Sequence, residues 1–331
     1  MAFQTGTSTD YQDLLADLRT FCLANGWTSD RYTTGAEDEV IFHGDGGASD
    51  EIYVGIKTYS NPGPGYYNWE LRGFTGFDNG LAFESQPGLC PATYVPLRNL
   101  SMDYWFFVDG RRICATIKTG SSYQFVYAGF IDPYSTDAEW PYPLLIMGSS
   151  GNSTTVFNSN EISYSSSINP ALTNGGSYTS YIRFVDGTWY PVYNFTSTST
   201  TETHTINGNK VSVWPQCNSV GTYPGEDTHF ITSGFRSLFA ATTQGGAPSM
   251  LLFRTENNGG TAVVPLIPLV LCMVDPSPQL LGEIHNVYWS TFTNGITAED
   301  TVTDGVTTDD YIIFQNIHRT DPWCGVAIKE E

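Results

Sequence analysis

Four tight-turn dipeptides, each between two short runs of apolar or β-branched residues, constrain the fold of this chain most strongly. They are Asp109-Gly110, Asp186-Gly187, Asn207-Gly208 and Asp304-Gly305. Such pairs tolerate the positive φ angles that tight hairpin turns require. A parallel sheet would instead need long helical crossovers, and helical periodicity is almost absent after Asn25. The sequence therefore predicts antiparallel sheets.

These turns define most of the predicted strands. The hairpins pair 104–108 with 112–118, 181–185 with 189–195, 203–206 with 210–214, and 301–303 with 311–315. A further strand is indicated where Ile52, Val54 and Ile56 occupy every second position, which is the period of a half-buried strand.

An amphipathic helix is predicted near the start of the chain, at residues 10–25. Its apolar residues recur at intervals of three and four positions, and they are Tyr11, Leu14, Leu15, Leu18, Phe21 and Cys22. Thr9 and Gln12 are expected to form a capping box at the start. Asn25-Gly26 is expected to end the helix, because glycine enters the left-handed conformation without a steric clash. Trp27 is expected to fold back over the apolar face.

The length of 331 residues is enough for two or three domains of about 100–200 residues each. Stretches rich in Ser, Thr, Asn and Gly place boundaries near residues 150 and 260. We expect a helix and an antiparallel sheet in 1–150, a hairpin-rich middle domain in 151–260, and a C-terminal β domain in 261–331. The predicted fold class is mainly β, with antiparallel sheets in sandwich-like domains and one N-terminal helix.

The charge and the apolar pattern exclude two classes of partner. The net charge of −20 argues against nucleic-acid binding, because phosphate contacts need Lys and Arg. It also opposes docking on anionic lipid. The longest apolar run, 262–274, contains two prolines and is shorter than the roughly 20 residues of a spanning helix. We therefore expect no nucleic acid and no membrane insertion.

The first nine residues lack the basic and apolar segments of a signal peptide. The six cysteines are scattered along the chain: Cys22, Cys90, Cys114, Cys217, Cys272 and Cys324. They are expected to be reduced core residues rather than disulfides or zinc ligands. Reduced cysteines and the lack of a signal peptide together lead us to expect synthesis in a reducing cytosol.

No short catalytic or cofactor motif occurs, since HExxH, GxSxG and the Walker lysine pattern are all absent. We therefore predict no catalytic residue, no cofactor and no metal. A glycan-cleaving enzyme would need only two carboxylates that the fold brings together. Candidates near aromatic residues are Glu70, Glu84, Asp132, Glu139, Glu226 and Asp227. The acidic tracts 45–51 and 299–310 are either calcium ligands or solvated loops.

Several residues are candidates for contact with other proteins. Aromatic residues make up 14% of the chain, and protein interfaces are enriched in aromatic residues and depleted in lysine. The lysines are Lys57, Lys118, Lys210 and Lys329. Four aromatic residues are candidate docking anchors: Tyr123, Tyr134, Trp140 and Tyr142. The alternative is that they pack in the core. Prolines between them would rigidify a docking loop. Arg111 and Arg112 are expected to form salt bridges with a neighbouring acidic chain rather than to bind phosphate.

Four parts of the chain together resemble a family of virion proteins from tailed bacteriophages and prophages. They are YQDLLADLRTFCLANGWT at Tyr11–Thr28, the segments Ile52–Gly88 and Tyr104–Ser150, and a tail made of Pro276–Ser290 with Tyr311–Lys329. The resemblance implies a structural subunit of the tail or baseplate that docks between the tail core and peripheral fibres. The implied partners are tail tube, baseplate wedge or fibre subunits, in a symmetric homo-oligomer within the virion. It implies no catalytic residues.

Other functions stay open at this stage. A receptor-binding or carbohydrate-binding tail-tip protein would use exposed aromatics and the loops of 151–260 to bind a host surface glycan. A head decoration protein would belong to the capsid instead. A glycan-cleaving enzyme would use two of the acidic candidates.

Overall fold

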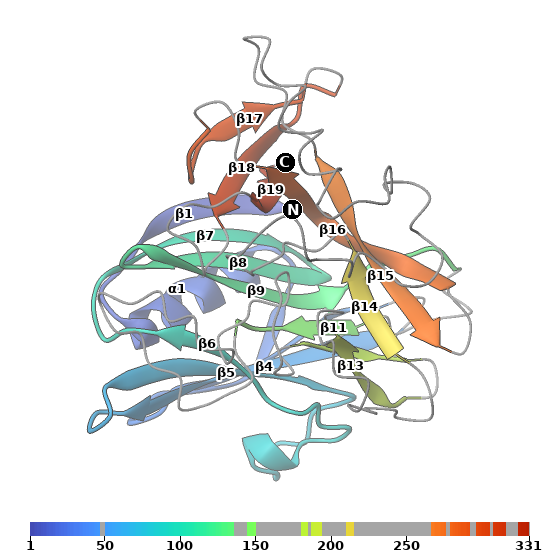
Figure 1. The fold of residues 1–331 in the computed structure, drawn as a ribbon. Coiled ribbons are helices and arrows are strands. Elements are labelled where there is room, and N and C mark those ends of the chain that lie inside the picture. The colour runs from blue at the N-terminus through green and yellow to red at the C-terminus, as the bar shows by residue number, and fades with distance from the viewer. Residues whose placement is uncertain are drawn as a thin grey trace.

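The computed structural model describes residues 1–46, 50–135, 144–149, 180–184, 187–193, 210–214, 266–275, 279–291, 296–304, 307–315 and 324–330. Their fold is mainly β, with antiparallel sheets and one α-helix near the N-terminus (Figure 1). This confirms the predicted fold class. A short 3-10 helix, η1, covers Phe83–Ser85. No helix in the described part of the chain is long and apolar enough to span a membrane.

Helix α1 extends over Tyr11–Ala24. Its N-cap is Asp10, whose carboxylate accepts hydrogen bonds from the backbone N–H groups of Gln12 and Asp13, so the predicted capping box on Thr9 is wrong. Asp10 satisfies two N–H groups that the first turn leaves without partners. The helix ends at Asn25 and Gly26 as predicted, with φ of 95° at the glycine.

The first layer is a five-stranded antiparallel sheet in the order β2-β3-β4-β5-β6. Its strands are β2 (Thr28–Thr33), β3 (Glu39–Asp45), β4 (Glu51–Asn61), β5 (Tyr66–Phe74) and β6 (Thr93–Leu97). The alternation predicted for β4 is confirmed, since Ile52, Val54 and Ile56 are all buried.

The middle layer belongs to a different sheet, and its strands are in the order β1-β7-β8-β9-β11-β12-β13. Its strands are β1 (Ala2–Ser8), β7 (Met102–Asp109), β8 (Arg112–Thr119), β9 (Ser122–Phe130), β11 (Leu144–Met147), β12 (Ser180–Arg183) and β13 (Trp189–Tyr193). The predicted pairings across Asp109-Gly110 and across Asp186-Gly187 are both confirmed as antiparallel.

A third layer is built from C-terminal strands in the order β14-β15-β16-β19-β18-β17. They are β14 (Lys210–Trp214), β15 (Ile267–Asp275), β16 (Gln279–Thr291), β17 (Thr301–Thr303), β18 (Asp310–Gln315) and β19 (Cys324–Lys329). Strand β14 joins this layer to the middle one by pairing with β13 in parallel. The β17–β18 pairing confirms the fourth predicted hairpin. Residues 203–206 lie outside the described residues, so the Asn207-Gly208 hairpin stays a prediction.

Two main cores hold the three layers together. The first core packs α1 and the five-stranded sheet against one face of β7, β8 and β9, and it includes Trp27, which folds back as predicted. The second core packs the other face of these strands against β15, β16, β18 and β19. Because strands from 1–150 and from 261–331 share the second core, the two regions are packed as one body. The boundaries near 150 and 260 lie next to residues outside the described ranges and stay predictions.

Three of the cysteines confirm the prediction of reduced core residues. Cys22, Cys90 and Cys114 are buried free thiols. Burial raises the pKa of each thiol, because a thiolate is costly in an apolar environment.

Candidate functional site

The structure separates the residues predicted to contact partners. Tyr123 is buried, and Arg112 is buried with its guanidinium paired inside its own chain. Arg111 is also used internally, since its guanidinium donates to the Gly46 carbonyl and lies 4.6 Å from the centre of the Phe130 ring. The expected salt bridge from Arg112 to a neighbouring chain is therefore replaced by ion pairs within this chain.

Tyr134 is the docking candidate that the structure leaves exposed. It is 51% exposed, and it is the only exposed aromatic residue among the side chains that the structure describes. Trp140 and Tyr142 lie outside the described residues. Tyr134 lies beside charged groups from two distant parts of the chain, and these groups form the candidate site. We call the set Arg112, Asp132, Tyr134, Glu283 and His285 the β10–β16 cluster.

Strand β10 (Asp132–Pro133) brings the two parts together by pairing with β16. Asp132 lies opposite Glu283, and Pro133 lies opposite Gly282. The backbone N–H of Tyr134 then donates to the Leu281 carbonyl at 3.0 Å. This short pairing fixes the positions of Asp132 and Tyr134 relative to the third layer.

The Arg112 guanidinium is the buried part of the cluster. Its Nε donates to the Phe130 carbonyl at 2.9 Å, its Nη1 lies 3.2 Å from an Asp109 carboxylate oxygen, and its Nη2 donates to Asp132. A buried charge is stable only when it is paired and hydrogen-bonded, and these three bonds supply the partners. Arg112 therefore links β8 to the end of β7, through Asp109, and to Phe130 and Asp132.

Asp132 connects Arg112 to His285. One carboxylate oxygen accepts from Arg112 and the other is hydrogen-bonded to Nδ1 of His285. Burial alone would raise the pKa of Asp132, but the hydrogen bond with His285 and the charge of Arg112 together lower it. The carboxylate thus stays ionised at neutral pH.

Strand β16 has an irregularity next to His285. The two-residue step along β15 from Pro268 to Val270 matches a five-residue step along β16 from Tyr288 back to Glu283. Strand β16 thus has three extra residues here, and Asn286 in this bulge has a φ of 59°. Bulges commonly re-aim side chains beside functional sites.

Glu283 fixes the exposed aromatic ring. The Tyr134 hydroxyl donates to Oε1 of Glu283 at 2.6 Å. The ring is therefore held by its hydroxyl at one end and by β10 at the other, while the residue as a whole is about half exposed. A fixed aromatic side chain loses little conformational entropy when a partner binds, which suits an anchor residue.

The buried Tyr123 belongs to a second polar contact. Its hydroxyl donates to Glu299, which also pairs with Lys118. Burial, and then the hydrogen bond with Glu299, raise the pKa of Tyr123. This contact ties β8 and β9 to the loop before β17, so Tyr123 acts in packing within the chain.

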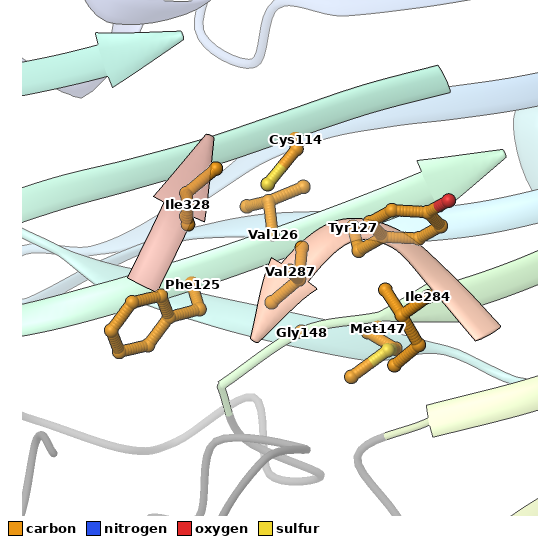
Figure 2. A pocket seen from close by; sticks show the side chains of 9 residues that line it. All are labelled: Cys114, Phe125, Val126, Tyr127, Met147, Gly148, Ile284, Val287 and Ile328. Carbon is orange, nitrogen blue, oxygen red and sulfur yellow. The ribbon is translucent and has the colours of Figure 1, made fainter. Parts of the chain in front are cut away.

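A small cavity lies between the middle and third layers. Its volume is about 20 Å³, enough for about one water molecule. Figure 2 shows its lining, which comes from Cys114, Phe125, Val126, Tyr127, Met147, Gly148, Ile284, Val287 and Ile328. The lining is apolar, and such cavities stay dry. The cavity is thus a packing gap and not a ligand site.

Among the acidic candidates that the structure describes, Asp132 lies in the cluster and the other two form separate ion pairs. Glu70 pairs with Arg72 and Glu84 pairs with Lys57, each at 2.7 Å. Glu139, Glu226 and Asp227 lie outside the described residues. In the described parts of the two acidic tracts, and in the other described residues, no group of three or more His, Cys, Asp or Glu side chains is arranged to hold a metal ion.

Sequence reasoning did not select His285 and Glu283 as site residues. They lie about 150 positions from Asp132 and Tyr134, and no local motif links them. No protein-family model matches the chain, and the comparison with curated proteins finds no match either. The resemblance of the sequence segments to virion proteins therefore stays a prediction.

Proposed function

We propose that this chain is a non-enzymatic structural subunit of a tailed-phage virion, placed in the tail or baseplate between the tail core and peripheral fibres. Its partners are other virion proteins such as tail tube, baseplate wedge or fibre subunits. It works in several symmetric copies and is assembled in the host cytoplasm. Docking, rather than turnover of a small molecule, is its function.

The observation that carries this proposal is the exposed Tyr134 on its fixed base. Interface hot spots are enriched in tyrosine, and a preorganised side chain loses less entropy on binding. The β10–β16 cluster supplies such a surface, since the Tyr134 hydroxyl is bound by Glu283 and the strand below it is anchored through Asp132 and Arg112. The net charge of −20 keeps unassembled copies apart until a surface of opposite charge is met.

The same geometry favours a second candidate, a carbohydrate-binding tail-tip protein. Tyr134 is an exposed aromatic residue, and the carboxylates of Asp132 and Glu283 lie beside it. Carboxylates accept hydrogen bonds from hydroxyl groups, so the cluster can bind a host surface glycan. A glycan array would separate this candidate from a purely structural role.

The test uses particles assembled with Tyr134→Ala. We expect incorporation into isolated tails to fall at least fivefold, while the purified variant keeps the circular dichroism spectrum of the wild type. The matched control is Leu100→Ala, because Leu100 is another exposed apolar side chain, 61% exposed, on a different loop. Quantitative mass spectrometry of separated head and tail fractions gives the readout.

The proposal would be contradicted if the wild-type chain were absent from tails or present only in tailless capsids. It would also be contradicted if Tyr134→Ala were incorporated into tails as well as Leu100→Ala. Release of reducing ends from a bacterial polysaccharide at enzymatic rates would contradict the non-enzymatic role.

A further inference from the structure

The outer edge of β1 is open in the described part of the chain. Strand β1 is the first strand of the path β1-β7-β8-β9, and β7 is its only strand partner there (Figure 1). Thr5 and Thr7 on β1 are exposed. An edge strand of this kind presents unpaired N–H and C=O groups that can pair with another chain.

The other sheet edges carry features that oppose such pairing, whereas β1 does not. Edge strand β2 contains the charged pair Asp30-Arg31, and edge strand β6 contains Pro96. The last edge, β17, has only three residues. Charged residues, proline and short length are the usual means by which proteins protect edges. Strand β1, with the sequence AFQTGTS, has no charge and no proline, and its register with β7 shows no bulge.

Strand β1 is also held rigidly. Phe3 packs on Phe107 with ring centroids 5.0 Å apart. Tyr104 covers Gly6 so closely that a Cβ on the glycine would lie 2.5 Å from the tyrosine hydroxyl oxygen. The Gln4 side chain donates to the same hydroxyl at 3.0 Å. Since the edge is already ordered, an added strand would not have to order it, and less entropy is lost on binding.

The charge at one end of β1 indicates what kind of strand fits. Ser8 donates to Asp17 at 2.6 Å, and Thr7 donates to Asp103 at 2.8 Å. Lys118 lies across from Asp103, but its ammonium pairs with Glu299. The C-terminal end of β1 is therefore flanked by carboxylates, which favour a cation nearby.

We propose that the outer edge of β1 accepts an extended strand from a different protein, with Lys or Arg at the end of that strand beside Ser8. Strand addition of this kind gives affinity through main-chain hydrogen bonds. A second copy of this chain fits less well, because its residues 1–9 contain no Lys or Arg side chain and offer only the Met1 ammonium, and because each copy has a net charge of −20. This inference does not depend on the phage assignment or on Tyr134.

The experiment measures peptide binding to the full chain by fluorescence anisotropy. The probe is a fluorescein-labelled peptide, Lys-Lys-Thr-Val-Thr-Val-Thr-Val, whose basic end lies beside Ser8 in an antiparallel pairing. We expect at least tenfold weaker binding for the Glu-Glu counterpart, and at least tenfold weaker binding when alternate amides of the basic peptide are N-methylated. N-methylation removes the main-chain donors and keeps the charge, so it separates strand pairing from simple attraction.

Two variants of the chain locate the binding. Thr5→Lys on the exposed edge of β1 is expected to weaken binding at least tenfold, and Asp103→Asn is expected to reduce the preference for the basic peptide severalfold. The matched control is Thr33→Lys, which places the same residue on the exposed edge of β2 and should leave the affinity unchanged. The proposal would be overturned if the acidic or the N-methylated peptide bound as tightly as the unmodified basic peptide. An equal loss of affinity in Thr33→Lys, or no binding of the basic peptide at all, would also overturn it. Self-association through β1, seen as concentration-dependent amide protection of residues 2–8, would also overturn it.

Discussion

Asp132 sets how the β10–β16 cluster responds to acid. Its carboxylate is bound by the Arg112 guanidinium and by the His285 imidazole, and burial opposes these two effects without outweighing them, so its pKa is lowered. The unfolded chain has an ordinary aspartate pKa of about 3.9. When the pH falls, the unfolded state therefore takes up the proton first, and the contribution of Asp132 to stability is lost between that value and the lower pKa of the folded state.

The corresponding prediction concerns Asp132→Asn. At pH 7 we expect the free energy of unfolding in urea to fall by only about 1 kcal/mol, because the Asp132 side chain is 46% exposed. The difference from the wild type should shrink as the pH falls below about 4. An equal difference at pH 7 and pH 3 would contradict the assigned role.

Glu330→Gln serves as a control, because its expected effect on the free energy of unfolding at pH 7 is opposite to that of Asp132→Asn. Burial, and then the charge of Asp310, raise the pKa of Glu330, so its charged form destabilises the folded state at neutral pH. We therefore expect this variant to be slightly more stable than the wild type at pH 7, and this gain should disappear in acid as the native carboxyl becomes protonated.

At the scale of elements, the β10–β16 pairing depends on a glycine. A Cβ on Gly282 would lie 2.4 Å from the carbonyl oxygen of Asp132 and 2.8 Å from Cα of Pro133. Both are backbone atoms, so neither can move aside without shifting β10 away from β16. The close approach places Asp132 and Tyr134 where His285 and Glu283 reach them.

We predict that Gly282→Ala lowers the free energy of unfolding by about 1–3 kcal/mol, the usual cost of overpacking. It should also raise the hydrogen-exchange rate of the Tyr134 amide, which donates to Leu281 across this pairing. The control is Gly35→Ala, because nothing lies within 4 Å of a Cβ at Gly35. Unchanged exchange at Tyr134 would show that β10 does not need this contact.

The sequence predicts elements that depend on neighbouring residues and misses those that depend on distant ones. The Asp109-Gly110 hairpin is predictable because the turn and both strands lie within about 20 residues. The cap on Asp10 was missed because Thr9 and Asp10 are both good N-cap residues, and only the backbone decides between them. The pairing of Asp132 with Glu283 has no local signal, and neither has the contact between Asp132 and His285. Of the candidate site, only Tyr134, Arg112 and Asp132 could therefore be selected from the sequence.

At the scale of the whole molecule, the middle layer is buried on both faces. One face of β7 and β9 contributes Tyr104, Phe106 and Val126 to the first core. The other face contributes Trp105 and Phe125 to the second core, which the C-terminal strands cover. Continuous apolar runs in β7 and β9 follow from this double burial. Composition indicates such strands, but it does not reveal which part of the chain covers the second face.

The last prediction tests whether 261–331 is an independent domain. Trp105 and Phe125 both pack on Phe314 of β18, with ring centroids 5.2 and 6.3 Å apart. A chain ending at residue 260 would expose these rings, and each large apolar side chain left in water forfeits about 1.5–3 kcal/mol. We expect the shortened chain to aggregate, or to bind the dye ANS strongly, in light scattering and fluorescence measurements beside the full chain. A monomeric shortened chain with no added dye binding would show instead that the first 260 residues fold independently and that the second core is an interface between domains.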